Sequence, residues 1–498
     1  MFPSKSVLPV AGRLRTWHVS SVSNLAGNTQ VRVRSPGEQD GAGSGSAVVA
    51  LCGVQFVDVL GVTVVVTALP RMLADLGGTP AAGTLVVTAY AMFFGGLLMV
   101  ASRIGDRLGH RRVVLWALAL FAVASVLGAL AESVWMLASA RALQGAAAAA
   151  SVPCALRLLT TVVPEGPVRR RAVAGWSAAG ATAGASGFFV GGVLTEIMSW
   201  RAVFWLDILL AAVLAAAIVG TIPRDHADSS GVRIGWRSSL LLVGGAMGVV
   251  AGTTMLGEDR LRVLGAVVTA LGLLATSGFV VLERRSRHPL VERAAWRTRG
   301  LRWGAFGSFF ATATTSSSVI VATLYLQDKL GLTPLRAAML LVSFSILAAV
   351  GSALAPRLVA ILGWSRSMGA GLGVIAAGTL VYAAWPQVAG IGLAAAAGGL
   401  GIGITSVAAN DMGTTVDVHL KGTASGVLNT AAQLGAAVGV AAIGLVATAT
   451  QPRIAWLVVV ALATGAAVAA AISRVADATS VGERERDPAR RVPLRARP

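Results

Sequence analysis

The charged stretch ASRIGDRLGHRR, residues 101–112, separates two long apolar runs and is the clearest guide to the fold. Before it, residues 81–100 read AAGTLVVTAYAMFFGGLLMV, and after it residues 113–131 read VVLWALALFAVASVLGALA. Each run is about 20 residues long, which is the length of an α-helix that crosses the hydrocarbon core of a bilayer. The pattern therefore predicts two membrane-spanning helices joined by a short basic loop.

Apolar runs of this kind recur along most of the chain. Of its 498 residues, 55% are hydrophobic and 13% are charged, whereas a soluble domain carries about 25% charged residues. This composition excludes a soluble multi-domain enzyme, a disordered scaffold and a disulfide-stapled secreted module. We therefore predict an all-α integral membrane protein with fourteen transmembrane helices. The predicted spans are 47–69, 81–100, 113–131, 134–155, 172–194, 202–220, 238–256, 263–282, 303–326, 337–355, 367–385, 388–409, 423–449 and 454–473.

Lys and Arg are distributed unevenly between the two sets of alternate loops. The formal net charge is +19, and most of the basic residues lie in the tails 1–46 and 474–498 and in every second loop. Because cytoplasmic loops carry the excess of basic residues, this bias places both termini in the cytoplasm of a multi-pass protein of the cell membrane. The same bias explains the positive net charge, so we expect no nucleic acid as a partner. The opposite loops contain only Arg71, Arg201, Arg260, Arg262, Lys329, Arg336 and Arg453.

The basic loop contains a pattern beyond its charge. Gly105 and Gly109 predict a tight turn, because glycine adopts backbone conformations that other residues avoid. Asp106 has arginines on both sides and is expected to pair locally or to cap a neighbouring helix. A basic cytoplasmic loop alone explains the arginines, but the combination G-D-R-x-G-x-R-R is more specific.

This combination resembles the signature loop of the major facilitator superfamily, with Ser102 and Ile104 in place of a Gly and a Leu. In that family the loop latches two six-helix bundles on the cytoplasmic side. A second stretch at 355–366 looks like a decayed copy, with Ala360 at the position of the Asp, as expected for an internal repeat. The residues to which the gating role carries over are Gly105, Asp106, Arg107, Gly109 and Arg111.

The fourth span contains Arg141, roughly 10 Å along the helix from its outer boundary. Arginine keeps its proton in proteins, so the guanidinium must snorkel outward, face a watery cavity or meet a carboxylate. The segment Arg141-x-x-Gln144-Gly145 is similar to a second signature of the superfamily, in which this arginine assists proton coupling. The resemblance implies the same role for Arg141.

Two acidic residues in the spans are candidate partners of this arginine. Asp58 lies near the middle of the first span, and Asp207 lies roughly 9 Å beyond Arg201 in the sixth. A carboxyl group that is balanced between burial and a nearby guanidinium can take up a proton on one side and release it on the other. We predict that Asp58, Arg141 and Asp207 couple protons to transport, with Asp58 as the direct partner of Arg141. The alternatives are a protonated Asp58 that a backbone carbonyl satisfies and an Asp207 that is solvated or structural.

Glycines recur at helical spacing in the fifth span, whose residues 180–194 read GATAGASGFFVGGVL. They leave one smooth face for close packing or bending. The stretch resembles the antiporter signature G-x-x-x-G-P-x-x-G-G, which implies an exporter. Phe188 occupies the proline position, so we expect a weaker kink. The packing glycines of the motif are Gly184, Gly187, Gly191 and Gly192.

Together with the extra pair of spans, these motifs resemble the fourteen-span drug:proton antiporter group of the superfamily, the EmrB/QacA type. The segments 199–207 and His288-Pro289-Leu290 and the run SGVLNTAAQLGAAVGVA of the thirteenth span add to the likeness, which covers about residues 47–473.

Two positions depart from the pattern of this group. Gly61 stands where the group has Asp, and Asp207 stands where it has Asn. Asp58 lies three residues before Gly61 on roughly the same helical face. We therefore expect that the acidic function has migrated to Asp58 and is shared with Asp207. The alternative is a proton coupling that differs from that of the group.

The resemblance implies the major facilitator fold, with two six-helix bundles and an inserted helix pair around a midplane cavity. The implied activity is export of a hydrophobic or amphipathic organic compound in exchange for protons, by a monomer in the lipid bilayer. A proton-independent facilitator or a secondary importer of a small organic solute is the alternative. The predicted domains are a disordered cytoplasmic tail at 1–46, an N-terminal six-helix bundle at 47–237, an inserted helix pair at 238–282, a basic cytoplasmic linker at 283–302, a C-terminal six-helix bundle at 303–473 and a cytoplasmic tail at 474–498.

Polar and aromatic side chains within the spans are candidates for lining the cavity. Helix–helix hydrogen bonding also explains each of them taken singly. Asn429 and Gln433, four residues apart on one face, are the strongest C-terminal pair. The candidates are Gln55, Thr63, Tyr90, Gln144, Thr314, Ser318, Tyr325, Asn429 and Gln433.

The sequence lacks the residues that ATP binding, metal binding or a structural disulfide would need. No G-x-x-x-x-G-K-[ST] segment is present to bind the phosphates of ATP. Cys52 and Cys154 both lie within apolar runs, which argues against a structural disulfide or a metal site. No span carries a pair of His or a cluster of Asp that would hold a metal. We therefore expect a transporter without enzymatic activity, cofactor or metal.

Overall fold

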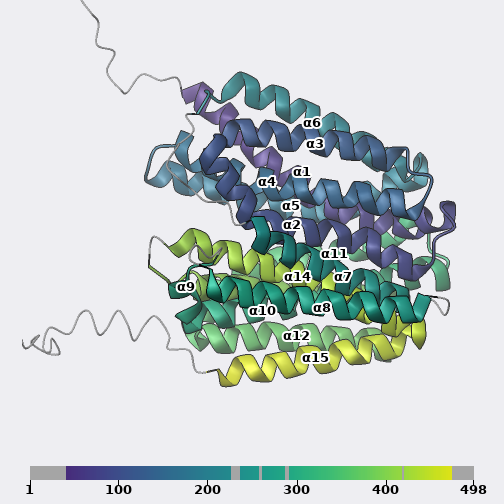
Figure 1. The fold of residues 1–498 in the computed structure, drawn as a ribbon. Helices are drawn as coiled ribbons and strands as arrows, with labels where there is room; N and C mark the ends of the chain where they lie inside the picture. The colour runs from purple at the N-terminus through teal and green to yellow at the C-terminus, as the bar shows by residue number, and fades with distance from the viewer. Residues whose placement is uncertain (1–40, 226–235, 257–260, 287–290, 418–419, 474–498) are drawn as a thin grey trace, which may run out of the picture. The chain divides into compact units, whose positions relative to one another are not determined.

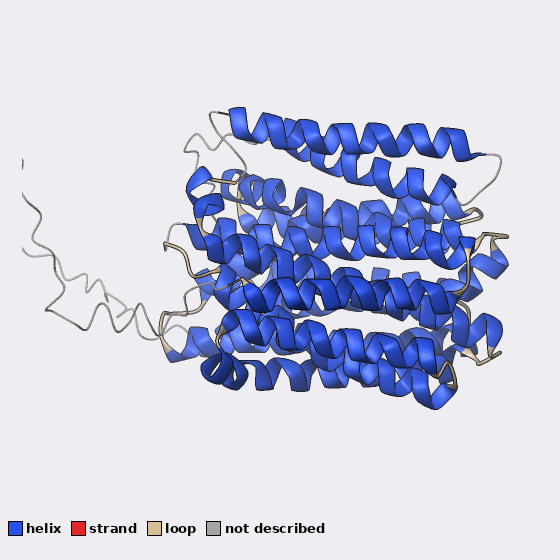
Figure 2. Ribbon diagram, turned by 90° about the horizontal axis from the view of Figure 1, so that it is seen from below, coloured by secondary structure: helices blue, strands red, loops and turns tan. Residues whose placement is uncertain are grey.

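Helices account for almost all of the chain that the structure describes. The computed structural model describes residues 41–225, 236–256, 261–286, 291–417 and 420–473, and within these ranges no residue lies in a strand (Figure 2). In these ranges, fourteen helices are long and apolar enough to cross a membrane, which confirms the predicted number of spans. The His288-Pro289-Leu290 segment, the tail 474–498 and residues 1–40 of the other predicted tail lie outside the described residues.

The helices follow one another along the chain in the predicted order. The first six are α1 (Gly41–Asp75), α2 (Pro80–Leu108), α3 (His110–Ala129), α4 (Val134–Val162), α5 (Pro167–Ile197) and α6 (Arg201–Thr221). Next come α7 (Trp236–Leu256), α8 (Arg262–Arg285) and the short α9 (Arg293–Arg297). The last group is α10 (Arg299–Leu324), the π-helical turn η2 (Tyr325–Lys329), α11 (Pro334–Leu362), α12 (Trp364–Ala384), α13 (Val388–Gly413), α14 (Lys421–Ala449) and α15 (Pro452–Ile472).

Several helices run further than the apolar runs that predict them. Helix α1 already includes residues 41–46, which corrects the prediction that they belong to a tail, and it continues through Pro70 to Asp75. Helix α2 continues through Gly105 to Leu108, which corrects the prediction of a turn at Gly105. Only Gly109, with φ +92°, turns the chain into α3. Hydropathy marks the apolar part of a helix, whereas intrahelical hydrogen bonds carry it on into the polar boundary.

The helices pack in two groups. Helices α2, α3, α4 and α6 contact mainly one another, and so do α10–α15, whereas α5 contacts α11 more than it contacts α4 or α6 (Figure 1). Helix α1 joins the first group, because Trp200 Nε1 and Arg201 at the α5–α6 junction both donate to the Asp75 carboxylate. Contacts between the groups run along two seams, α2 with α14 and α5 with α11. The grouping agrees with the predicted order, and the domain boundaries themselves stay a prediction.

The two ends of the helices differ in their loops. We call the end that carries the α2–α3, α4–α5 and α8–α10 connections the basic end, and the end that carries the α1–α2, α3–α4 and α5–α6 connections the opposite end. The long side chains that remain exposed between the ends are apolar, such as Leu209, Leu271 and Leu274. Exposed leucines on a membrane helix face lipid at no cost, since lipid tails are as apolar as leucine.

The helix pair α7–α8 lies against one of the two seams. Its helices approach closely, because a Cβ atom at Gly248 would fall on Gly272 and one at Gly252 on Thr269. Small residues let membrane helices pack backbone to backbone in this way. Helix α7 contacts both α2 and α14, whereas α8 contacts α7 and is otherwise largely exposed. The pair therefore covers the α2–α14 seam.

Candidate functional site

A buried polar cluster crosses the first helix group at the level of Arg141. The Arg141 side chain of α4 is 1% exposed, so it does not snorkel to the surface. Its Nη1 donates to Gln144 Oε1 at 2.7 Å, and Gln144 Nε2 donates to Asp207 Oδ2 of α6 at 3.1 Å. Gln144 Nε2 also donates to Ser125 Oγ of α3 at 2.8 Å. Gln144 thus links the guanidinium to the Asp207 carboxylate, which is itself 1% exposed.

A second carboxyl group is held on the same side of α4. Ser151 Oγ donates to Asp58 Oδ2 of α1 at 3.0 Å, and Asp58 is 6% exposed. Ser151 lies seven residues after Gln144, which is two turns along the same helical face and about 10 Å. Helix α4 therefore holds Asp207 and Asp58 at two levels, with Asp58 nearer the basic end.

Tyr90 of α2 connects the two levels. The Arg141 guanidinium carbon lies 4.5 Å from the centroid of the Tyr90 ring, which is a cation–π contact. The Tyr90 hydroxyl donates to the backbone carbonyl of Asp58 at 3.2 Å. The approach of α2 to α4 depends on Gly145, because a Cβ there would overlap the Tyr90 carbonyl oxygen.

The arrangement differs from the predicted direct pair of Arg141 and Asp58. No ion pair joins them in the described part of the chain, and the guanidinium is linked through Gln144 to Asp207 instead. Sequence reasoning missed Ser125 and Ser151. A serine within an apolar run is the only signal for each of them, and it does not say which helix the hydroxyl faces. The Gly61 position faces the Phe121 ring rather than this cluster.

A cavity of about 210 Å³ lies between the two helix groups, and Tyr90 forms part of its wall. Three of the predicted lining residues, Thr63, Tyr90 and Gln433, are in that wall. Most of the other lining side chains are apolar, including Phe188 of the glycine-rich helix α5. The full lining is Val62, Thr63, Val66, Val87, Thr88, Tyr90, Ala91, Phe188, Thr312, Ser316, Val319, Ile320, Phe344, Ala432, Gln433, Ala436, Ala437 and Val440.

The other candidate lining residues lie elsewhere. Gln144 belongs to the buried cluster, and Gln55 faces Gly180 of α5. Asn429 is exposed one helical turn from Gln433 toward the basic end, and its amide donates to Ser425. Thr314 and Ser318 are buried within the second helix group, outside the wall of this cavity.

Tyr325 lines a second cavity of about 350 Å³ at the opposite end. Asp328 and Lys329 of η2 also line it, and Ile320 and Val440 belong to the walls of both cavities. In the same turn Gln327 Nε2 donates to the Thr67 carbonyl of α1 at 3.0 Å, so η2 joins the two helix groups.

The glycines of α5 face two helices rather than one. A Cβ at Gly187 would overlap the Thr63 hydroxyl, and one at Gly191 would overlap the Thr67 hydroxyl, both on α1. Gly192 instead approaches Ala338 of α11. These contacts correct the prediction of a single smooth face. Helix α5 runs unbroken past Phe188 from Pro167 to Ile197.

Gly184 lies where α5 approaches both α1 and α11. Its carbonyl accepts a hydrogen bond from Ser345 Oγ of α11 at 2.8 Å. Nearer the opposite end, Glu196 Oε2 accepts a hydrogen bond from the backbone N–H of Leu335 at 3.0 Å. No hydrogen bond joins α5 to α11 on the basic side of Gly184 in the described ranges. The α5–α11 seam is thus fastened from its middle to the opposite end.

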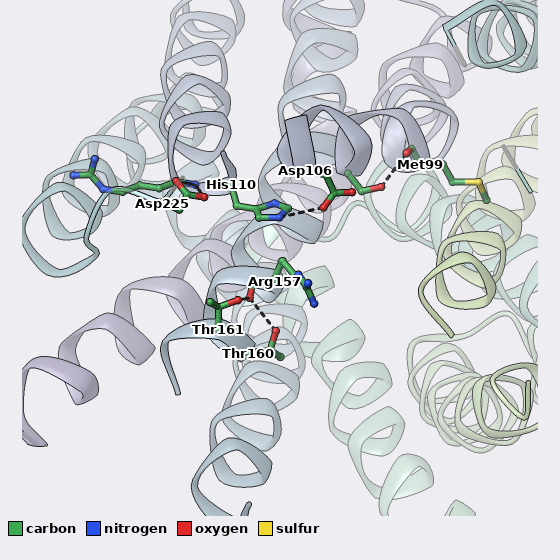
Figure 3. A network of polar contacts seen from close by, with 9 residues as sticks. Met99, Asp106, His110, Arg157, Thr160, Thr161 and Asp225 are labelled. Carbon is green, nitrogen blue, oxygen red and sulfur yellow. Dashed lines mark hydrogen bonds and ion pairs between the residues drawn. The ribbon is translucent and has the colours of Figure 1, made fainter. Parts of the chain in front are cut away.

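At the basic end, His110 at the start of α3 contacts residues near the end of α2 (Figure 3). His110 Nε2 lies 3.3 Å from Asp106 Oδ1, so His110 is a local partner of Asp106, and the Arg157 and Arg103 charges interact with the same carboxylate. Gly105 leaves the space that the His110 ring and the Cys154 thiol occupy. Arg107 is exposed.

The N-terminus of α3 is capped by Asp225, a residue that sequence reasoning did not single out. Its carboxylate accepts hydrogen bonds from the backbone N–H of Arg111 at 3.2 and 3.3 Å, and Arg111 Nη2 donates to the Val219 carbonyl of α6. A carboxylate at a helix N-terminus is stabilised by the unpaired N–H groups there. Asp225 and Arg111 therefore join α6 to the start of α3.

The proposed internal repeat is visible in the backbone. Gly363 between α11 and α12 has φ +79°, and Gly109 between α2 and α3 has φ +92°. Both glycines end one long helix and begin the next at once. In the described residues, no group of three or more His, Cys, Asp or Glu side chains is placed to hold a metal ion.

Comparison with known proteins gives consistent matches along the chain. The family model described as Major Facilitator Superfamily matches residues 51–440, with a further match at 304–497. The puromycin resistance protein pur8 of Streptomyces alboniger is 33% identical over 419 residues, which cover 80% of this chain and 81% of that protein. The cephamycin export protein CmcT of Amycolatopsis lactamdurans is 37% identical over 297 residues, 57% of this chain, and the match spans 60% of that protein.

Solved structures share the fold at low sequence identity. The crystal structure of the human organic anion transporter MFSD10 (TETRAN) matches with a TM-score of 0.61 and 15% identity, over 87% of this chain and 100% of that one. A crystal structure of the nucleoside transporter NupG matches with a TM-score of 0.63 and 12% identity, over 86% of this chain and 100% of that one.

Proposed function

Because the chain belongs to the major facilitator superfamily, we propose that it is a secondary transporter that exports hydrophobic or amphipathic organic compounds in exchange for protons. Relatives named for antibiotic export or resistance support the direction and the kind of cargo. The observation that carries the proton part is the buried link from Arg141 through Gln144 to Asp207, with Asp58 held on the same helix. A charge within the membrane is costly, so such groups are retained for function.

The orientation follows from the basic end. We place this end in the cytoplasm, with both termini there, because cytoplasmic loops carry the excess of Lys and Arg. The hydrogen bonds of the α5–α11 seam lie from Gly184 to the opposite end, and Asn429 on the basic side of the cavity is exposed. In the α2–α14 seam, the Thr430 hydroxyl donates to the Gly95 carbonyl on the basic side, so this contact must part when cargo enters. Cargo then enters the central cavity from the basic end and leaves after the two helix groups have rocked to open the opposite end.

Protons move in the reverse direction through the two carboxyl groups. Asp207 lies nearer the opposite end and takes up the external proton in the outward-facing state. Its neutralisation weakens the attraction that holds Arg141 through Gln144, because the Arg141 and Asp207 charges interact. Arg141 then re-pairs toward Asp58, cargo leaves, and the proton is released to the cytoplasm in the inward-facing state. This cycle uses both aspartates in sequence.

Tyr90 connects the cargo cavity to the residues that couple protons. Tyr90 lines the cavity, and the Arg141 guanidinium carbon lies 4.5 Å from the centroid of its ring. A compound that binds in the cavity therefore presses on the same side chain that positions the guanidinium. The driving force is sufficient, since one elementary charge that crosses 100 mV releases about 2.3 kcal/mol, enough for a roughly fifty-fold gradient.

Transport in inside-out vesicles, with and without an acid lumen, tests this function. Proton-driven uptake is expected for the wild type and is expected to be lost in Asp58→Asn and Asp207→Asn, because an amide cannot carry the proton. Asp417→Asn at an exposed site of the basic end is the matched control and should transport normally. Unaltered proton dependence in both single variants and in the double variant would remove both carboxyl groups from the mechanism.

The same assay separates the alternative function. A proton-independent facilitator or an importer shares the fold, and Phe188 at the proline position of the antiporter signature is the departure that favours it. Such a protein would equilibrate cargo at the same rate whether or not a proton gradient is present. The function as monomer and the six-domain division of the chain remain parts of the proposal.

A further inference from the structure

The central cavity offers hydrogen bonds but no charge. Its polar lining consists of hydroxyl groups and one amide, and every lining residue belongs to the described part of the chain. None of these lining residues is Asp, Glu, Lys, Arg or His. The polar residues in the wall are Thr63, Thr88, Tyr90, Thr312, Ser316 and Gln433.

The charged side chains of the first helix group are turned away from the cavity. Asp328 and Lys329 line the second cavity and not this one. The Asp58 carboxyl group is directed to Ser151, and the Asp207 carboxyl group is directed to Gln144. Behind the wall, the Arg141 guanidinium covers one face of the Tyr90 ring, and its charge repels a cation there. A cation in the cavity would find no counter-ion among the lining residues and a guanidinium behind Tyr90.

A charged cargo would lose its hydration here without a partner. Removing an ion from water is unfavourable unless an opposite charge and hydrogen bonds replace the solvent. A neutral compound loses little, because its apolar part fits the valine, alanine and phenylalanine lining and its polar groups meet the hydroxyls and the Gln433 amide. Resting on the proposed proton-coupled export, we infer that the cargo of this site is an uncharged amphipathic organic compound and that each exchange moves the net charge of the proton.

Proteoliposomes with inside-out protein test the cargo class with two probes. N-phenyl-1-naphthylamine is neutral, and ethidium is a permanent cation. With an acid lumen, the wild type is expected to take up the neutral probe at least tenfold faster than ethidium. Equal or faster uptake of ethidium would overturn the inference while leaving proton-driven export intact.

Two matched variants test whether a carboxylate in the cavity wall admits a cation. Gln433→Glu keeps the size of the side chain, which packs against Gly95, and adds a carboxylate to the cavity wall. It is expected to admit ethidium at least tenfold faster than the wild type. Gln387→Glu makes the same change at the exposed residue that precedes α13 and should leave ethidium excluded. Ethidium uptake that rises equally in both variants, or in neither, would contradict the inference.

A membrane potential tests whether each exchange moves net charge across the membrane. A lumen-positive potential, set by potassium and valinomycin at equal pH, should drive uptake of the neutral probe by the wild type, with roughly tenfold accumulation for about 59 mV. Uptake that responds to pH but not to potential would overturn the charge assignment. Selective uptake of the neutral probe that ignores both gradients would support the cargo class and refute the proposed proton coupling.

Discussion

Replacing Tyr90 separates the contribution of its ring from that of its hydroxyl group. The Arg141 guanidinium lies 4.5 Å from the ring centroid in a buried site, and a desolvated cation–π contact contributes about 2 kcal/mol. The hydroxyl makes one hydrogen bond of 3.2 Å to the Asp58 carbonyl, which contributes about 1 kcal/mol net. Tyr90→Leu removes both contributions, about 3 kcal/mol, whereas Tyr90→Phe removes only the hydrogen bond. At 1.4 kcal/mol per factor of ten, Tyr90→Leu should slow proton-driven transport roughly 140-fold and Tyr90→Phe roughly fivefold.

The assay is the initial rate of proton-driven cargo uptake, measured together with the Michaelis constant because Tyr90 also lines the cavity. A positioning role for the ring predicts that Tyr90→Phe retains a fixed number of protons per cargo molecule, whereas Tyr90→Leu loses this fixed ratio. Thermal unfolding in detergent micelles controls for loss of the fold. Equal losses in the two variants, or full coupling in Tyr90→Leu, would refute the assignment of the ring as the support of Arg141.

Two further predictions concern packing and capping. Gly145→Ala places a methyl group on the Tyr90 carbonyl and should lower stability by about 1–3 kcal/mol in thermal unfolding, whereas Gly220→Ala, which meets open space, should not lower it by clash. Equal melting temperatures for Gly145→Ala and the wild type would contradict the close α2–α4 contact. Asp225→Asn weakens the charge at the α3 N-terminus beside Arg111 and should cost about 0.3–1 kcal/mol, seen as a small fall in the same unfolding temperature. An unchanged temperature would exclude a stabilising cap.

The positions of the spans were predictable, but their exact ends were not. An apolar run of about 20 residues must be satisfied by a helix in lipid, so hydropathy alone finds each span. It does not register residues 101–108, because the Arg and Asp side chains there lower the hydropathy while the helix continues. The first span was predicted to end at residue 69, yet α1 passes through Pro70 to Asp75.

The identity of the buried ionisable residues was also predictable, because Asp58, Arg141 and Asp207 interrupt apolar runs. Their partners were not. Which residue meets which depends on how far each helix is rotated and which helix is its neighbour, and a single sequence contains neither quantity. Arg141 therefore meets Gln144 and Tyr90 rather than Asp58.

The partners that sequence reasoning missed are small or lie at helix ends. Ser125 and Ser151 are ordinary serines in apolar runs until the helix that each one faces is known. Asp225 lies after α6, far in sequence from the α3 N-terminus that it caps. Polar residues in the spans were over-assigned to the cavity, since Gln55, Gln144 and Asn429 have other surroundings.

Direct measurement of proton movement during cargo flow tests the central claim that buried acidic and guanidinium groups exchange protons for cargo. Proteoliposomes that contain a trapped pH-sensitive dye are given a cargo gradient and no initial pH gradient. The wild type should move protons against the cargo flow, and the double variant Asp58→Asn, Asp207→Asn should move none. Cargo flow in the wild type without any change in lumen pH, or an unchanged proton signal in the double variant, would contradict the account.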